Sequence, residues 1–195
     1  YDRTSQREVY CVDDNDVKGL GSAIEGKKSP KRLITTTFAD QFRLHTQFRN
    51  KVIGVSLKDR SAVLSTGHSA NAAYWFAGGD EGVFTTSTYY MDSLPNWVSE
   101  YNAKKYPHQY ASSEWNTLRP IETYKASGPD DTPYEGIYKG ADRPTFPYDF
   151  STLSPDYYKD KGLDIVRNTP FGNTLVTDMA PVSYTHLTLP TTLVV

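Results

Sequence analysis

Residues 51–60 read KVIGVSLKDR, and this segment says most about the architecture of the chain. Its first part is an almost continuous run of aliphatic and β-branched side chains, from Val52 to Leu57, with Gly54 between them. Strands that are buried on both faces of a parallel sheet have this composition, because neither face meets water. The segment therefore predicts a buried strand over residues 51–57, followed directly by charged residues.

A helix is predicted immediately before this strand. Ser29 and Pro30 are typical of a helix start, with serine as the N-cap and proline at the first helical position. Hydrophobic side chains then recur at a spacing of four residues up to a predicted end at Asn50, namely Ile34, Phe38 and Phe42. A helix followed by a buried strand is half of a βαβ unit, so the predicted fold class is α/β.

The chain changes in character after residue 60. Residues 70–76 pass from small to aromatic side chains, residues 83–90 read as a strand, and residues 94–101 have hydrophobic side chains at helical spacing. Residues 107–150 are dominated by Pro, Gly, Tyr, Asp and Thr, and so long an irregular stretch is usually functional or an insertion such as a lid. A last helix is predicted to begin at Thr169-Pro170, with a stripe of Phe171, Leu175 and Met179.

Composition excludes several classes of protein. Of the 195 residues, 37% are hydrophobic and 23% are charged, which suits a globular domain with a core rather than a disordered chain. The net charge of −2 argues against a nucleic-acid-binding surface, and no apolar run is long enough to span a membrane. The single cysteine, Cys11, is expected to be a small buried side chain in a short N-terminal strand around Val9–Val12.

The candidate chemistry lies at the end of the predicted strand, at Lys58 and Arg60. Ligands of open α/β sheets bind beyond the carboxyl ends of strands. If the chain stays extended there, residues two apart point to the same side, so both cations face one way and Asp59 faces the other. A phosphoryl group suits such a pair, because arginine offers a planar fork and lysine a point charge. A solvated turn, or an ion pair of Asp59 with either neighbour, would also explain the pattern.

Other chemistry-bearing residues favour structural roles. His68 is expected to be a loop histidine held by hydrogen bonds rather than a ligand or base. The carboxylates of Asp13, Asp14 and Asp16 lack the glycine and terminal glutamate of a calcium loop, so a solvated turn is expected. The tryptophans could form a sugar or base platform, although packing is their more common role; they are Trp75, Trp97 and Trp115.

The last residues have a different composition from the rest of the chain. Residues 182–191 read VSYTHLTLPT, which resembles one translated frame of the transposon-end adapter used to prepare sequencing libraries. Pro181 is expected to end the last helix, and residues 182–195 contain no charged side chain apart from His186. We therefore predict that residues 181–195 are a non-native tail, and His186 enters no argument about a metal site.

Several motifs, in order along the chain, resemble the two-zinc, threonine-nucleophile alkaline phosphatases of the alkaline phosphatase superfamily, which are related to the type I phosphodiesterases/nucleotide pyrophosphatases. They extend from about Tyr1 to Ala180. They are KVIGVSLKDR (51–60), Gly67-His68, AYWF (73–76), TSTYY (86–90), LPNWV (94–98), WNTL (115–118), PTFPY (144–148) and TPFGNTL (169–175).

The resemblance implies a role for the cation pair and a plan for the chain. It implies that Lys58 and Arg60 contact the nonbridging oxygens of the transferred phosphoryl group, which favours phosphate monoesters. It also implies a partial alkaline-phosphatase-like sheet with helices, interrupted by a large irregular α+β insertion. We accordingly expect residues 1–60 to be part of the α/β core, residues 61–164 to be a lid over the active site, and residues 165–180 to begin a core helix.

The remaining catalytic machinery of the family has no counterpart in this sequence. By resemblance, the threonine nucleophile and an aspartate zinc ligand precede it, and further Asp and His ligands of the two zinc ions follow it. We therefore expect an internal fragment, inactive by itself, with no catalytic or metal-ligating residue, taken from a periplasmic or secreted enzyme that acts on small phosphate esters. Two alternatives stay open: a phosphodiesterase or nucleotide pyrophosphatase of the same superfamily, and a non-enzymatic ligand-binding module rich in Tyr and Trp.

Overall fold

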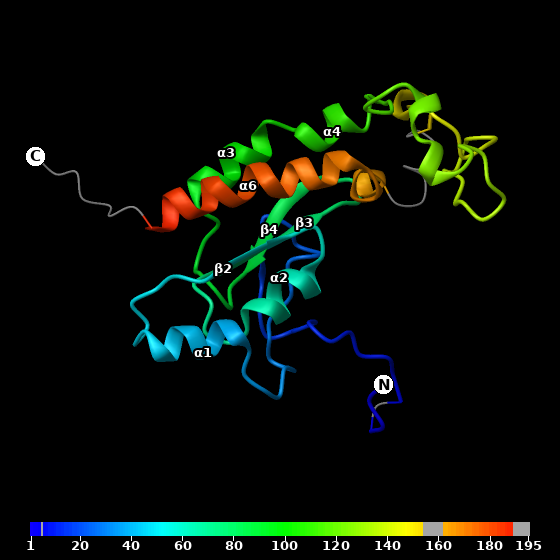
Figure 1. Cartoon of the computed structure of the whole chain (residues 1–195). Coiled ribbons are helices and arrows are strands. Elements are labelled where there is room, and N and C mark those ends of the chain that lie inside the picture. The colour runs from blue at the N-terminus through cyan, green and yellow to red at the C-terminus, as the bar shows by residue number, and fades with distance from the viewer. Residues whose placement is uncertain (5, 154–161, 189–195) are drawn as a thin grey trace, which may run out of the picture. The chain divides into compact units, whose positions relative to one another are not determined.

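The structure is a computed structural model that describes residues 1–4, 6–153 and 162–188 (Figure 1). The chain divides into two compact units. We call the first the sheet unit, which comprises Tyr1–Ala77, Val83–Lys104 and Thr174–Val195, and the second the loop unit, which comprises Gly78–Gly82 and Lys105–Asn173. Within the described residues, no helix is both long and apolar enough to cross a bilayer.

The sheet unit is built on a mixed sheet of four strands in the order β1-β4-β3-β2. Parallel pairing joins β2 (Ile53–Ser56) to β3 (Ala72–Ala77), while β4 (Val83–Ser87) runs antiparallel both to β3 and to β1 (Gly19–Leu20). Between the parallel strands lies α2 (Asp59–Thr66), which completes a βαβ unit. The predicted α/β class is confirmed, but α2 itself was not anticipated from the sequence.

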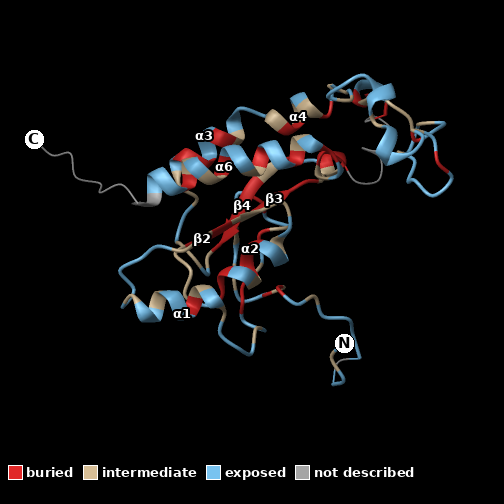
Figure 2. Cartoon of the chain, in the orientation of Figure 1, coloured by how far each residue is buried: buried red, intermediate tan, exposed pale blue. Residues whose placement is uncertain are grey.

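The fully buried strand is β3 rather than β2. Every residue of β3 is buried, whereas β2 is half-buried except at Gly54 (Figure 2). The prediction that residues 51–57 form a buried strand is therefore wrong in its burial, although the strand exists. The reason is position, because β3 has a neighbour on each side, while β2 lies at the edge of the described sheet.

Helices cover both faces of β3 (Figure 1). On one face lies α2, which approaches the neighbouring strand β2 so closely that a Cβ at position 54 would lie 2.5 Å from the carbonyl oxygen of Ala62, which explains Gly54. The other face holds α3 (Asn96–Ala103) and α6 (Pro170–Thr188), joined by a hydrogen bond from the Tyr101 hydroxyl to the Leu175 carbonyl. Aromatic rings fill the space between α3 and the sheet, since Tyr74 meets Trp97 edge-on at 5.3 Å.

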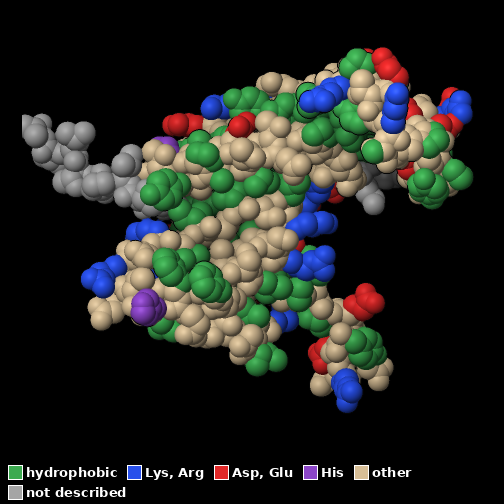
Figure 3. Space-filling model, in the orientation of Figure 1, with side chains coloured by type: hydrophobic (Ala, Val, Ile, Leu, Met, Phe, Trp, Pro, Cys, Tyr) green, Lys and Arg blue, Asp and Glu red, His purple; other side chains and the backbone are tan. Residues whose placement is uncertain are grey.

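The first helix is shorter than predicted and presents its hydrophobic side to solvent. It is α1 (Phe38–His45), and it begins at Thr37 rather than at Ser29-Pro30. Thr37 and Asp40 form a capping box, which satisfies two backbone donors at once and so fixes the start of the helix. The predicted stripe is exposed, with Phe38 86% accessible, and hydrophobic side chains are visible over α1 in Figure 3.

The N-terminal segment forms no strand at Val9–Val12 within the described residues, so that prediction is wrong. Val12 packs into the core of the sheet unit, while Cys11 is exposed rather than buried. Asp14 is also buried, contrary to the expected solvated turn, because it accepts a hydrogen bond of 2.6 Å from the Ser29 hydroxyl. Ser29 therefore anchors this loop instead of capping a helix.

The last helix confirms one prediction and corrects another. Leu175 and Met179 are completely buried, as their spacing predicts. However, α6 continues through Pro181 to Thr188, so the proline does not end it. A proline inside a helix removes one backbone donor and its ring crowds the preceding turn, which can kink a helix without ending it. Of the predicted non-native tail, residues 189–195 lie outside the described residues, and its origin stays a prediction.

The loop unit has little regular structure, as predicted for residues 107–150. Its helices include α4 (Tyr106–Tyr110) and the short 3-10 helices η1 (Ile121–Thr123), η2 (Lys125–Ser127) and η3 (Leu163–Asn168). A two-stranded ladder pairs β5 (Glu114–Trp115) with β6 (Tyr148–Asp149). Of the predicted lid, residues 154–161 lie outside the described residues.

Candidate functional site

Lys58 and Arg60 lie where β2 gives way to α2. The strand ends at Ser56, Lys58 is the N-cap residue of α2, and Arg60 is in its first turn; both side chains are exposed. The assumption of an extended chain is wrong, because the helix begins at Asp59. The pair nevertheless lies at the carboxyl end of a parallel strand, where ligands of α/β sheets bind. The start of a helix also favours anions, because its first backbone N–H groups have no partner within the helix.

Asp59 contacts the N-terminal segment and the backbone of its own helix rather than the cationic side chains on either side. Its Oδ1 accepts a hydrogen bond of 2.6 Å from the backbone N–H of Arg60. The same oxygen accepts a hydrogen bond of 2.7 Å from the Tyr10 hydroxyl, and Oδ2 lies 3.6 Å from Lys28 Nζ. No ion pair joins Asp59 to Lys58 or Arg60 in the described part of the chain. The alternative in which Asp59 neutralises an adjacent cation is therefore not what the structure shows.

The ring of Tyr10 lies beside two cations. Arg60 Cζ is 5.4 Å and Lys28 Nζ is 5.0 Å from its centroid, distances at which cations interact favourably with an aromatic ring. Burial, together with the hydrogen bond to Asp59, raises the pKa of Tyr10, so the phenol keeps its proton and acts as a donor. Sequence reasoning missed this contact, because Tyr10 is 49 residues away from Asp59 in the chain.

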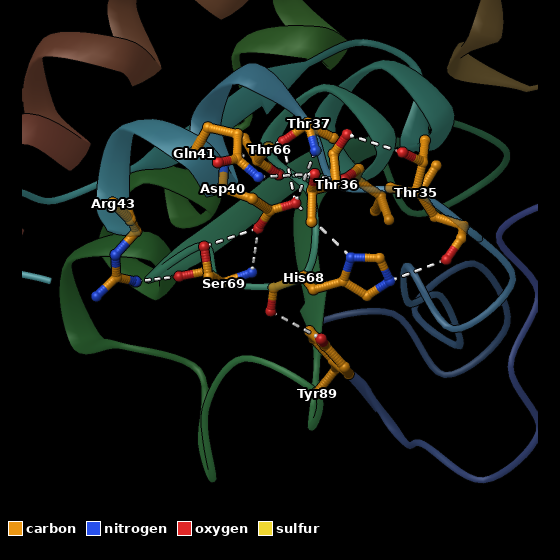
Figure 4. A network of polar contacts seen from close by, with 12 residues as sticks. Thr35, Thr36, Thr37, Asp40, Gln41, Arg43, Thr66, His68, Ser69 and Tyr89 are labelled. Carbon is orange, nitrogen blue, oxygen red and sulfur yellow. Dashed lines mark hydrogen bonds and ion pairs between the residues drawn. The ribbon is translucent and has the colours of Figure 1, made fainter. Parts of the chain in front are cut away.

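A separate polar network surrounds Asp40 in the sheet unit (Figure 4). Asp40 is 3% exposed, and it accepts hydrogen bonds from the backbone of Thr37 at 3.0 Å and of Ser69 at 2.8 Å. Burial acts to raise the pKa of Asp40, but the hydrogen bonds from Thr37 and Ser69 outweigh it and hold the pKa well below its usual value. Thr37 is three residues from Asp40 in the chain and Ser69 is 29 residues away, so the network fastens α1 to the turn that precedes β3.

His68 belongs to this network as a structural residue. Its Nε2 is 3.0 Å from the Leu33 carbonyl, its Nδ1 is 3.7 Å from Asp40, and its own carbonyl accepts from the Tyr89 hydroxyl. The prediction of a loop histidine held by hydrogen bonds is confirmed. Figure 4 shows the imidazole lying along the surface of the turn between these groups.

The tryptophans divide between two roles. Trp75 and Trp97 are buried in the sheet unit, whereas Trp115 is half-buried in the loop unit. There it meets Phe146 edge-on at 5.0 Å and Tyr148 at 5.6 Å, and the three rings form one wall of a cavity of about 660 Å³. We call this cavity the aromatic cavity.

Two carboxylates also line the aromatic cavity, from Asp130 and Glu135. Asp130 Oδ2 accepts a hydrogen bond of 3.0 Å from the backbone of Phe146, which holds that ring in place. Burial raises the pKa of Tyr148, and the negative charges of Asp130 and Glu135 raise it further. The lining thus combines aromatic rings with acceptors, which suits a small organic ligand.

The zinc ions that the resemblance implies were tested against the residues present. In residues 1–4, 6–153 and 162–188, no group of three or more His, Cys, Asp or Glu side chains is arranged to hold a metal ion. Catalytic zinc needs three protein ligands of these types. The described residues do not supply that set.

Taken together, these observations define an α/β protein that carries two cations at the carboxyl end of a parallel strand. No family model matches the chain. The chain is, however, 45% identical to the alkaline phosphatase PhoV of Synechococcus elongatus and 44% identical to the alkaline phosphatase PafA of Elizabethkingia meningoseptica, in each case over 92% of its own length. It is also 45% identical, over 89% of its length, to a protein of Myroides odoratus named calcium-transporting ATPase.

The fold comparison agrees with the sequence comparison. The crystal structure of PafA superposes on 98% of this chain with a TM-score of 0.86 and 41% identity. The chain is thus homologous to a segment of the PafA-type alkaline phosphatases, as the sequence motifs predict. It spans about a third of the length of these relatives, namely 32% of PhoV and 32% of PafA, and 31% of the Myroides protein.

Proposed function

We propose that the protein containing this segment hydrolyses phosphate monoesters, and that Lys58 and Arg60 hold the transferred phosphoryl group. The observation that carries the proposal is the position of Lys58 and Arg60 at the carboxyl end of β2, in a chain of which 98% superposes on PafA. A second solved structure supports it. That structure is of a PafA variant in which a lysine and an arginine two positions apart, the spacing of Lys58 and Arg60, are both replaced by alanine.

The charge of the substrate explains why two cations favour a monoester. The transferred group of a monoester spreads its negative charge over three nonbridging oxygens, whereas one of these positions is esterified in a diester. Arginine binds two such oxygens with its planar fork, and a lysine ammonium adds a point charge. Lys58 and Arg60 therefore stabilise the monoester more than the diester.

The rest of the mechanism is proposed from the family resemblance. A threonine outside this segment would attack the phosphorus and displace the alcohol of the ester, and water would then hydrolyse the resulting phosphothreonine and release inorganic phosphate. The resemblance implies that residues outside this segment would hold two zinc ions, which would supply Lewis-acid chemistry when bound. Within this segment, the contribution of Lys58 and Arg60 is to bind and orient the phosphoryl group.

The proposal is tested by replacing both cations in the full-length protein, Lys58→Ala with Arg60→Ala. Because a hydrogen bond to a charged group contributes about 1.5–3 kcal/mol, we expect kcat/KM for a monoester to fall roughly 100- to 10,000-fold. Turnover of a diester should fall much less. A matched control, Arg119→Ala with Lys125→Ala, removes the same charge from exposed positions in the loop unit and should leave both activities unchanged.

The outcomes separate the enzyme classes. Unchanged monoester turnover in the Lys58→Ala, Arg60→Ala protein would show that the pair does not hold the phosphoryl group. A wild-type protein that prefers diesters strongly would instead be a phosphodiesterase or nucleotide pyrophosphatase of the same superfamily. Assay of the isolated 195-residue chain, for which we expect neither hydrolysis nor tight zinc binding, locates the missing machinery outside it.

We also propose that the full-length protein is periplasmic or secreted, as the family resemblance implies. Fractionation of cells that express it from its own gene should recover it outside the cytoplasm. Recovery with a cytoplasmic marker would contradict this part of the proposal.

The aromatic cavity favours a second candidate function, a ligand-binding module. Its three contacting rings and two carboxylates could recognise a sugar without any chemistry. Titration of the full-length protein with oligosaccharides tests this idea, with tryptophan fluorescence as the measure of binding. Binding that disappears in Trp115→Ala, in a protein that hydrolyses no phosphate ester, would favour the module over the enzyme.

A further inference from the structure

We propose that Tyr10 is a positioning residue for Arg60. Its hydroxyl binds the Asp59 carboxylate, and its ring supports the Arg60 guanidinium. The inference rests on the proposed function, since it assigns Arg60 to the phosphoryl group. Four contacts bring the groups together. The Tyr10 hydroxyl donates to Asp59, the Arg60 guanidinium lies against the Tyr10 ring, and Lys28 lies beside both Tyr10 and Asp59.

The first effect of Tyr10 is on Asp59. A carboxylate next to Arg60 in sequence would pair with the guanidinium and compete with an incoming phosphoryl group for the same N–H donors. Asp59 is instead engaged on both oxygens. Oδ1 accepts from the Tyr10 hydroxyl at 2.7 Å and from the backbone N–H of Arg60 at 2.6 Å, and Oδ2 lies 3.6 Å from Lys28 Nζ. Its side chain is only 15% exposed, so this arrangement is partly shielded from water. The arginine therefore keeps its donors for a ligand.

The second effect of Tyr10 is on the arginine itself. Arg60 is exposed, and a long exposed side chain loses conformational freedom whenever it binds a ligand. The Tyr10 ring, 5.4 Å from Arg60 Cζ, gives the guanidinium a flat surface while leaving its edge available for hydrogen bonds. Restricting the side chain before binding lowers the entropic cost of the contact.

Lys28 also helps to hold the Tyr10 ring in place. Its ammonium is 5.0 Å from the ring centroid, and it also pairs with Asp13 at 2.5 Å. Two residues from the N-terminal segment, Tyr10 and Lys28, thus fasten the first turn of α2. A packing role alone would not require a hydroxyl that points at the carboxylate beside the phosphate-binding arginine.

The test is a double-mutant cycle in the full-length protein, with Tyr10→Phe or Tyr10→Leu combined with Arg60→Ala. Phenylalanine keeps the ring and removes the donor, and we expect a fall in monoester kcat/KM of about threefold to tenfold. Leucine removes ring and donor, and we expect a fall of about tenfold to thirtyfold. In the Arg60→Ala protein either change should lower the rate by no more than about twofold, because nothing remains to be positioned.

Two further measurements separate positioning from damage to the fold. Turnover of a diester should change by less than about twofold in Tyr10→Phe, since diesters depend less on Arg60. Tyr89→Phe is a matched control, because it removes another hydroxyl donor of the sheet unit, the one bound to the His68 carbonyl, and should leave monoester turnover unchanged. If Tyr10→Leu does not fold, Tyr10→Phe in both backgrounds completes the cycle.

Each outcome supports or overturns the inference. Non-additive losses confined to monoesters support it. Equal losses with and without Arg60, or equal losses for monoester and diester, overturn it while leaving the proposed function intact. If Arg60→Ala, alone and together with Lys58→Ala, changes nothing, both the proposed function and this inference fall.

Discussion

Two groups of aromatic side chains, one in the sheet unit and one in the loop unit, differ in their burial. In the sheet unit, the rings of β3 and β4 are completely buried, and Phe76 and Phe84 contact each other at 5.9 Å inside the core. In the loop unit, Trp115 and Phe146 are half-buried and line the aromatic cavity. The same residue types therefore support stability in one unit and offer a binding surface in the other. Replacing the same type of residue in each unit, and comparing the loss of stability, should distinguish these two roles.

The largest expected difference is between two tryptophans. Trp75 is 1% exposed, and its indole N–H donates to the Glu25 carbonyl at 2.9 Å, so Trp75→Ala should destabilise the protein by about 3–5 kcal/mol. Trp115→Ala removes a half-buried ring and should cost about 1 kcal/mol. Urea unfolding of the full-length variants measures both. Equal losses would show that the aromatic cavity is part of a core.

A smaller difference is expected between two glycines. A Cβ at position 54 would lie 2.5 Å from the Ala62 carbonyl oxygen, so Gly54→Ala forces β2 and α2 apart and should cost about 1–3 kcal/mol. At Gly136, in the loop unit, a Cβ would meet nothing within 4 Å, and alanine should change stability by less than about 0.5 kcal/mol. Thermal unfolding provides the comparison, and an unaffected Gly54→Ala protein would contradict the close packing of α2.

The next prediction concerns the pH dependence of stability. The pKa of Asp40 is lowered in the folded state, so its ionised form stabilises the fold above the unfolded-state pKa of about 3.9. That contribution is lost as the pH falls from about 5 toward the lower folded-state pKa. Asp40→Asn should cost about 1–2 kcal/mol at neutral pH and flatten the acid limb of the stability curve. Asp80→Asn, an exposed aspartate of the loop unit, serves as the control, and an unflattened acid limb in Asp40→Asn would count against this role.

The smallest expected effect is local to the aromatic cavity. The carboxylates of Asp130 and Glu135 both raise the pKa of Tyr148, after burial. Glu135→Gln removes one of these charges and should therefore lower the pKa of Tyr148, without a measurable change in stability. Titration of 13C-labelled tyrosine followed by NMR detects the shift. An unchanged pKa would show that Glu135 lies too far from the phenol to matter.

The sequence predicted features that depend on residues close together in the chain better than features that depend on distant residues. Patterns that depend on neighbours in sequence predicted β4, α3 and the buried stripe of α6, and they placed Lys58 and Arg60 at the end of a strand. Capping decided where α1 begins, and the choice of Thr37 over Ser29 depends on Asp14, a partner from another loop. Position in the sheet, which no local pattern encodes, made β3 rather than β2 the buried strand.

The site was found only in part for the same reason. Two cations at one strand end are visible in the sequence, but the groups that surround them come from residues 10 and 28. Their approach depends on how the N-terminal segment packs against α2, which periodicity does not report. Conversely, the exposure of Phe38 shows that a regular hydrophobic spacing does not guarantee burial.

The distance along the chain between Tyr10 and Asp59 has a consequence for the order of folding. The βαβ unit of β2, α2 and β3 joins residues close in sequence, whereas the Tyr10 contact closes a loop of 49 residues and pays more chain entropy. We therefore expect the strand end to form early with an unrestrained Arg60, and residues 1–28 to dock onto it late. Resistance to proteolysis in the N-terminal segment should accordingly appear last during refolding, together with full phosphoryl affinity.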